Sequence, residues 1–175
     1  MILSLFNRPK SIGNVPALYL AIVAQSRREI FFRDWGVADT MTGRFDMVSL
    51  HVGLVLRRLR AEGRNTQHFC QDLFDYFFQD MDRSLREAGV GDLSIGKRIG
   101  KMGELFYGLL VNLSRALDAD DREDMRGVLS RNFFEGETPE ALTAFTAYVF
   151  DAARALDAQD PAAILEGTIS FEPHP

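Results

Sequence analysis

The residues best equipped for chemistry lie between Asp72 and Met102. The first half of this stretch, up to Glu87, is acidic and aromatic, and a short break at 89–91 contains glycines. The second half is basic and again rich in glycine. Folding a helical hairpin does not require this order of charges, so we expect the stretch to meet a binding partner.

One candidate chemistry is phosphate binding, because the run from Gly91 to Arg98 looks like a phosphate loop. Such a loop needs a serine or threonine after its lysine to hold magnesium, and a strand that leads into its glycines. Here Arg98 follows Lys97, and the preceding segment has helical spacing. The sequence therefore argues against nucleotide binding.

A second candidate is a carboxylate metal site formed by Asp72, Asp75, Asp80 and Asp82. Helical di-metal sites normally pair such carboxylates with a Glu-x-x-His motif on facing helices, and the chain has no such motif. The aspartates do not continue into a calcium loop either, since no glycine follows at the required turn. We interpret them as a solvated helix face and expect no metal.

His51 and Cys70 are the remaining candidates. His51 lies among apolar residues at helical spacing, which is typical of a hydrogen-bonded core histidine. Cys70 is close to His68 in sequence but on a different helix face, so the two do not form an obvious thiolate–imidazolium pair. Haem binding through His51 or His68 stays open, although no haem-attachment motif is present. No set of nucleophile, base and orienting group is recognisable, so we expect no enzyme.

The charge pattern is more informative. One basic cluster contains Arg57, Arg58, Arg60 and Arg64, and another contains Lys97, Arg98 and Lys101. These clusters either neutralise the acidic helix face or recognise an acidic or phosphate-bearing partner, such as a protein segment, RNA or lipid headgroups. Tyr76 and Phe78 flank the apolar stripe of their helix and would anchor such an interface.

Helices must position all of these residues, because helical spacing dominates the chain and strand-like alternation is absent. The segment 42–61 is apolar nearly all round, which is typical of a helix in the middle of a bundle. We predict an all-α fold, a single-domain bundle of about six to seven helices around this buried central helix. The expected helices are 16–28, 42–61, 65–88, 92–119, 120–134 and 139–159, with a last turn after Asp160. Asp92 is the expected N-cap of its helix, and 31–40 is expected to pack as a hydrophobic loop.

Glycines recur on one side of the 92–119 helix, at Gly96, Gly100 and Gly103. Each costs roughly 1 kcal/mol relative to alanine in a helix interior. Their grouping predicts close approach by another backbone, either within the domain or from outside.

The composition is that of an ordinary globular protein: 175 residues, 46% hydrophobic and 26% charged. The net charge of −5 argues against DNA as a partner. A lone cysteine suits a reducing compartment, and no apolar run reaches membrane-spanning length. We expect a cytoplasmic protein, with 1–14 as a flexible segment, 15–167 as the helical domain and 168–175 as a tail. Contact of the apolar start with the inner face of a membrane is the alternative to a loose terminus.

Several blocks of the sequence carry a family resemblance. They are Leu18–Gln25, Gly36–Thr40, Gly43–Met47, His51, Leu56–Leu59 and Asp72–Met102. The specific combination is Gly43-Arg-Phe-Asp with Asp80-Met-Asp-Arg and Val90-Gly-Asp. With these blocks the chain resembles the ubiquinol–cytochrome c chaperone family, over about 18–134. It departs from the family at Ala38, where proline is expected, and at Gly100, where a basic residue is common.

The resemblance implies a soluble, largely helical assembly chaperone for the cytochrome bc complex, with newly made cytochrome b as its client. Mitochondrial members of the family also associate with the ribosome near its exit tunnel. The resemblance brings no catalytic residue, cofactor or metal. The alternative function is a helical small-molecule binder with a haem or quinone pocket. The residues expected to contact a partner are Arg44, Asp46, Arg57, Arg58, Asp75, Tyr76, Phe78, Asp80, Asp82, Arg83, Arg86, Asp92, Lys97, Arg98 and Lys101.

Overall fold

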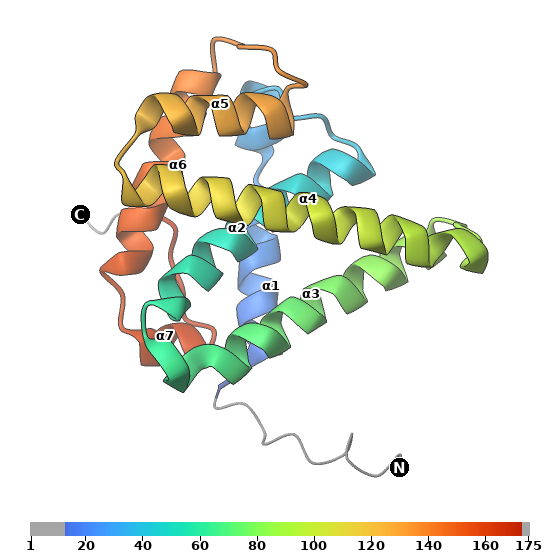
Figure 1. Ribbon diagram of the computed structural model, residues 1–175, viewed down its shortest axis with the longest axis horizontal. Coiled ribbons are helices and arrows are strands. Elements are labelled where there is room, and N and C mark those ends of the chain that lie inside the picture. The colour runs from blue at the N-terminus through green and yellow to red at the C-terminus, as the bar shows by residue number, and fades with distance from the viewer. Residues whose placement is uncertain (1–12, 173–175) are drawn as a thin grey trace.

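The computed structural model describes residues 13–172, and in this range the chain forms helices and no strand (Figure 1). The α-helices are α1 (Val15–Ser26), α2 (Met41–Arg60), α3 (Gln67–Glu87), α4 (Asp92–Asp118), α5 (Arg122–Phe133), α6 (Leu142–Asp157) and α7 (Pro161–Leu165). A π-helical turn, η1 (Ile30–Asp34), precedes α2, and a 3₁₀ turn, η2 (Gly63–Thr66), precedes α3. The all-α prediction is confirmed. The outermost parts of the predicted terminal segments, 1–12 and 173–175, lie outside the described residues.

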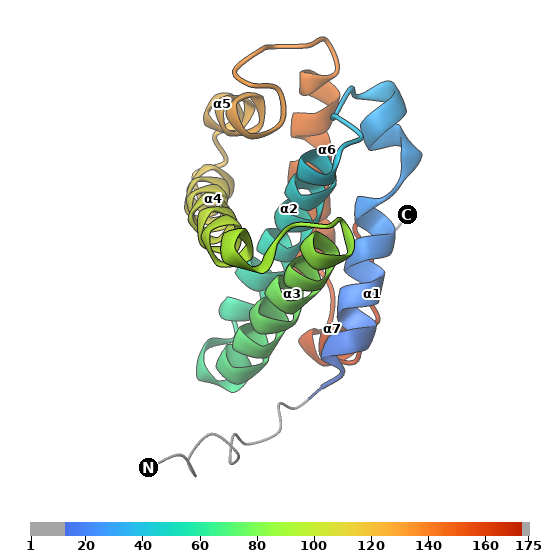
Figure 2. The same cartoon turned by 90° about the vertical axis from the view of Figure 1, so that its right-hand side faces the viewer.

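Helix α2 is the centre of the bundle. It contacts α1, α3, α4, α5 and α6, and Figure 2 shows α4 and α5 on one side of it and α1 on the other. Its side chains are buried on every face from Met47 to Leu56. Because an apolar helix can be covered all round only in the middle of a bundle, the predicted central helix is confirmed.

Side chains close several helix starts. The Asn14 side chain accepts a hydrogen bond from the Ala17 N–H at 3.1 Å, and Thr40 Oγ1 accepts one from the Gly43 N–H at 3.1 Å. Both satisfy backbone donors that the first helical turn leaves unpaired. Position 43 also requires glycine for a steric reason, because a Cβ there would lie 2.0 Å from the carbonyl oxygen of Ala38.

The prediction that Asp92 caps α4 is wrong. The N-cap is Gly91, and Asp92 is the first helical residue. Its carboxylate instead accepts a hydrogen bond from Arg86 at the end of α3. The charge still lies at the positive end of the helix dipole, so it is favourable there without capping a backbone N–H.

The segment predicted as a hydrophobic loop, 31–40, begins as the wide turn η1. The Trp35 N–H donates to the Ile30 carbonyl at 3.0 Å. Phe31 is fully buried, and its ring contacts those of Trp35, His51 and Tyr148 at centroid distances of 5.2–5.6 Å. The turn thus fastens the connection between α1 and α2 to the core.

Residues 168–172, predicted as part of an irregular tail, contain no helix but pack on the domain. Phe171 is buried, with its ring centroid 4.9 Å from that of His51. Gln159 exchanges two hydrogen bonds with the Ser170 backbone, at 2.7 and 2.8 Å. These residues therefore contact the helical domain, although they contain no helix.

Helices α3 and α4 form an antiparallel hairpin whose turn lies at one edge of the molecule, as Figure 1 shows. The two helices diverge away from this turn, and α4 runs on to meet α5. Between Asp92 and Leu105 the buried residue is Ile95. The first half of α4 is therefore the least supported long segment of the described chain.

Candidate binding surface

The acidic residues of α3 are paired mainly within their own helix. Asp80 forms an ion pair with Arg83. Asp82 pairs with Arg86, with Nε and Oδ2 2.7 Å apart, as the predicted acid-before-base spacing requires. Asp75 accepts a hydrogen bond from the Gln71 side chain at 2.8 Å. Asp80 and Asp82 are therefore neutralised within α3, without a contribution from the α4 cations.

Asp80 also fixes α3 to α1. The Tyr19 hydroxyl donates to Asp80 Oδ2 at 2.8 Å, and the ring of Tyr76 lies edge-on to Tyr19 at 5.2 Å. Burial, helped by the neighbouring carboxylate, raises the pKa of Tyr19, so the phenol stays protonated as the donor. Both Asp80 and Tyr76 thus have structural partners on α1.

Unlike the paired aspartates of α3, some basic residues at the start of α4 have no partner among the described residues. Lys101 reaches Glu104, with Nζ and Oε2 3.1 Å apart. Lys97 and Arg98 are exposed, and neither pairs with a carboxylate or makes a side-chain hydrogen bond within residues 13–172. Two neighbouring cations without an internal partner are available to an outside one.

An apolar and glycine-lined surface lies beside Lys97, whereas Arg98 lies on another side of the helix. We call this surface the α4 face, and it consists of Leu93, Gly96, Gly100, Tyr107 and Val111. The spacing of three, four or seven residues places them on one side of the helix. Leu93 is fully exposed, and Tyr107 and Val111 are 53% and 63% exposed.

The glycines of the α4 face have no packing role inside the domain. A Cβ at Gly96 or Gly100 would meet nothing within 4 Å, and one at Gly103 would meet only the Phe78 ring edge, at 4.0 Å. Close backbone approach within the domain, one of the two predicted explanations, is therefore wrong among the described residues. Approach from outside stays a prediction.

The aromatic anchors predicted on α3 are not free. Phe78 packs against Phe74 and Phe77, with ring centroids 4.7 and 4.9 Å away. The more exposed ring is Tyr107 of α4, which the sequence analysis missed. The available signal was its spacing of seven from Gly100, which places it on the glycine side of the helix.

The basic cluster at the end of α2 is only partly on the surface. Arg58 is buried, donates to the carbonyls of Leu156 and Gln159 at 3.0 Å each, and pairs with Glu62. Its predicted place in a partner surface is wrong, because its guanidinium holds the end of α6. Arg57 pairs with Asp118 at 2.9 Å and Asp157 at 3.3 Å, so it joins α2 to α4 and α6.

The other two arginines of that cluster, Arg60 and Arg64, are exposed. They line an open cavity of about 430 Å³ together with Phe74 and Tyr107. The exposed cations therefore continue from the end of α2 to the edge of the α4 face.

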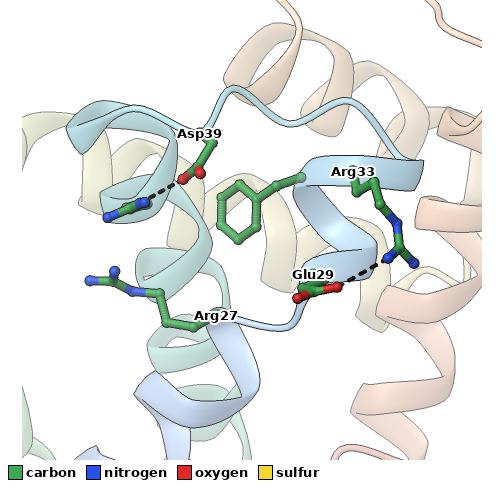
Figure 3. Close-up of a pocket in the computed structure, with 6 residues that line it drawn as sticks. Arg27, Glu29, Arg33 and Asp39 are labelled. Carbon is green, nitrogen blue, oxygen red and sulfur yellow. Dashed lines mark hydrogen bonds and ion pairs between the residues drawn. The ribbon is translucent and has the colours of Figure 1, made fainter.

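Arg44 lies elsewhere, at an open cavity of about 590 Å³ beside η1. Its Nε is 2.6 Å from Asp39 Oδ1, and this pair lowers the pKa of the Asp39 carboxyl. Figure 3 shows Asp39 and Arg27 at this cavity, with Glu29 paired to Arg33. Most charges here neutralise one another, so Arg44 belongs to this region and not to the α4 face.

Asp46 is also apart from the α4 face. It is partly buried at a small cavity between α2, α4 and α5. Burial raises the pKa of its carboxyl to about 7, and no side chain or backbone group of the described chain pairs with it.

His51 is the hydrogen-bonded core histidine that the sequence predicts. Its Nδ1 lies 2.7 Å from the Met47 carbonyl, and its Nε2 lies 2.6 Å from the Tyr148 hydroxyl. These contacts are satisfied when Nδ1 carries the proton and Tyr148 donates. Burial lowers the pKa of His51 to about 4. With both nitrogens engaged, His51 has no free lone pair for a haem iron.

The other described residues offer neither a metal site nor a reactive thiol. Within residues 13–172 no group of histidine, cysteine and carboxylate side chains is arranged to hold a metal ion. Burial raises the pKa of the Cys70 thiol, which makes it less reactive. None of the described helices combines the length and the apolar character that crossing a membrane requires.

Comparison with known proteins connects this architecture to a family. Residues 33–171 match the family described as "Ubiquinol-cytochrome C chaperone". Ubiquinol-cytochrome c reductase complex assembly factor 1 of Mus musculus is 26% identical over 159 residues, covering 89% of this chain and 54% of that protein. Its Xenopus laevis counterpart is 24% identical and is covered to 79%. The chain spans about half the length of the mouse and human relatives.

A solved structure agrees with the fold. The crystal structure of the Cbp3 homolog from Brucella abortus matches with a TM-score of 0.81 and 35% sequence identity. The match covers 89% of this chain and 87% of that one. The family resemblance predicted from the sequence is thus confirmed.

Proposed function

Because the chain belongs to the ubiquinol–cytochrome c chaperone family, we propose that it binds newly made cytochrome b and promotes assembly of the ubiquinol–cytochrome c reductase complex. Relatives that match most of its length are named as assembly factors of that complex. We further propose that it acts by binding and not by catalysis. The client and the mode of action are the parts of this proposal that need an experiment.

The observation that carries the proposal is the α4 face. Soluble domains rarely leave contiguous apolar side chains exposed unless another molecule covers them. Here Tyr107 and Val111, one helical turn apart, are exposed together, and Leu93 is exposed on the same side nearer the start of α4, in line with two glycines that the domain itself does not use. Each glycine weakens an exposed helix by roughly 1 kcal/mol relative to alanine. A bound partner would offset that cost.

A membrane-protein client fits such a surface. Helices of membrane proteins associate through small residues that let two backbones approach closely, as in the small-xxx-small pattern. Gly96 and Gly100 have this spacing, and space beside them is open. A hydrophobic client helix that has not yet reached its place could therefore lie along α4, with its apolar side chains against Leu93 and Val111.

Two cations of α4, Lys97 at the edge of the face and Arg98 farther round the helix, would orient the client. Lys97 and Arg98 have no partner in the described part of the chain, so acidic groups of a client would pair with them without breaking an existing ion pair. Contact with a ribosome or with lipid headgroups would use the same charges. The acidic residues of α3 contribute less, because Arg83 and Arg86 already pair with them.

Site-specific photo-crosslinking tests the client directly. A photo-reactive amino acid at position 100 would sit in the α4 face, and one at position 123 would sit on α5, where Glu123 is 89% exposed. After irradiation of membranes from expressing cells, we expect cytochrome b to be recovered with the first variant and not with the second. Equal recovery, or none from position 100, would contradict the proposed surface.

The alternative of a haem or quinone binder has weaker support. The cavity lined by Trp35 and Tyr148 measures about 370 Å³ and is large enough for a small ligand. It offers no free histidine, since both nitrogens of His51 are engaged. An absorbance titration with haem should show no saturable binding.

A further inference from the structure

The cavity beside Asp46 combines two unpaired oxygen groups with apolar walls. It measures about 180 Å³ and lies where α2, the middle of α4 and the end of α5 meet. Asp46 and Ser49 come from α2, three residues apart and thus on the same side of that helix. Leu105 and Phe106 of α4 form an apolar wall, and Arg131 of α5 stands at the cavity.

Ser49 is the structural anomaly of the described chain. Its side chain is buried, and its Oγ is the one buried side-chain nitrogen or oxygen in residues 13–172 without a hydrogen-bond partner. Buried hydroxyl groups nearly always have a partner, because leaving one unpaired is costly. Other buried hydroxyls of the chain follow the rule: Ser26 donates to the Ile22 carbonyl and Thr146 to the Leu142 carbonyl, at 2.8 and 2.7 Å.

Asp46 adds a second unpaired acceptor to the same cavity. None of the described residues donates to its carboxylate or pairs with it. Other partly buried carboxylates of this chain have an arginine within reach, as Asp82 and Asp124 do. The other charged residue in the cavity lining is Arg131, but its Nη1 lies back over Gly127, 3.1 Å from the position a Cβ would take there. Arg131 therefore lines the cavity without pairing with Asp46.

The hydrogen-bond acceptors and the size of the cavity indicate which ligand would fit it. A carboxylate and a hydroxyl are both able to accept hydrogen bonds, and the cavity is smaller than the pockets that hold drug-sized molecules. A single side chain with several N–H donors fits these limits. Guanidinium is weakly hydrated, stacks on apolar surfaces and pairs with carboxylates through two bonds, whereas an ammonium is more strongly hydrated.

We propose that the Asp46–Ser49 cavity is a binding site for one arginine side chain of a partner polypeptide. The guanidinium would pair with Asp46 and, after rotation of the Ser49 side chain toward the cavity, donate to its Oγ, with the exposed Leu105 beside it. This site is distinct from the α4 face, and it does not depend on which protein the client is.

The test uses the intact protein with N-methylguanidinium as the probe and NMR detection of the Asp46 carboxyl carbon. Tetramethylammonium carries the same charge without N–H donors and controls for ionic strength. We expect a saturable shift with the probe only, and binding at least tenfold tighter at pH 8 than at pH 5, because the carboxyl must be ionised. Bound probe should lower the pKa of Asp46 below about 7.

Variants locate the binding. We expect Asp46→Asn to abolish the pH dependence and Ser49→Ala to weaken binding several-fold, and both should fold, since each removes an unpaired group. The proposal is overturned by an absent or non-saturable shift, by an equal response to tetramethylammonium, or by unchanged binding in Ser49→Ala. A wild-type protein that binds nothing while Arg131→Ala binds the probe would also overturn it, by assigning the cavity to Arg131.

Discussion

The surroundings of His51 and the first half of α4 differ in how many of their side chains have a hydrogen-bond, ion-pair or packing partner inside the domain. Both nitrogens of His51 are hydrogen-bonded, and the rings of Phe31, Tyr148 and Phe171 lie within 5.8 Å of its own. On α4, Lys97 and Arg98 have no partner in the described chain, and the space beside Gly100 is open. The contacts of the first region stabilise the fold. The second is not explained by folding, which is why we assign it to binding.

The comparison predicts that replacing a large side chain with a small one lowers the free energy of unfolding strongly near His51 and hardly at all on α4. Phe31→Ala should lower the free energy of unfolding by about 3–5 kcal/mol, because it empties the centre of the aromatic cluster. Leu93→Ala, on a fully exposed residue, should change it by less than about 0.5 kcal/mol. Urea unfolding followed by circular dichroism measures both, and similar losses in the two variants would break the distinction.

The second largest expected effect is the change in the free energy of unfolding with pH. Burial lowers the pKa of His51 from 6.5 to about 4. The unfolded chain therefore binds a proton that the folded chain does not, and stability falls as the pH drops from about 6.5 to 4. Asp46 acts in the opposite direction, because burial raises its pKa from 3.8 to about 7. Its contribution to the free energy of unfolding therefore falls as the pH rises from about 4 to 7.

Removing one of the two groups separates these effects. Asp46→Asn should lose about 2 kcal/mol between pH 7 and pH 4.5, because the His51 effect is then unopposed. In the wild-type protein the gain from Asp46 offsets the loss from His51, so its stability should change little over the same interval. Urea unfolding at several pH values gives both slopes, and identical slopes would show that Asp46 titrates normally.

Glycine substitutions have smaller effects of opposite sign. Gly100→Ala should raise the free energy of unfolding by up to about 1 kcal/mol, since the residue is exposed within a helix and a methyl group meets nothing. Gly43→Ala should lower it, because the new Cβ would lie 2.0 Å from the Ala38 carbonyl oxygen. Thermal unfolding of the pair is the measurement. A destabilising Gly100→Ala would mean that this glycine has a structural role inside the domain.

The sequence was sufficient for the helices and the central position of α2, because periodicity and an all-round apolar pattern depend on local spacing. It also identified His51 as a core residue, from its apolar neighbours. It could not show which arginine of the 57–64 cluster turns inward, because Arg58 is buried by carbonyls of Leu156 and Gln159, far away in sequence. The Asp46–Ser49 cavity was hidden for the same reason, since α4 and α5 form its other walls.

Charge reversal on α4 should have almost no effect on stability and a large effect on function. Lys97→Glu with Arg98→Glu removes no internal ion pair, so we expect the free energy of unfolding to change by less than about 0.5 kcal/mol. The control for charge is Arg33→Glu with Arg154→Glu, which makes the same charge change at exposed positions of η1 and α6 and also breaks exposed ion pairs that contribute little to stability.

The most direct test is the amount of assembled ubiquinol–cytochrome c reductase complex in cells that carry these two double variants as their only copy of the protein. The account predicts a clear loss of complex with the Lys97–Arg98 variant, at normal levels of the chaperone itself, and no loss with the control. Normal complex levels in the Lys97–Arg98 variant would contradict the assignment of α4 as the client-binding surface.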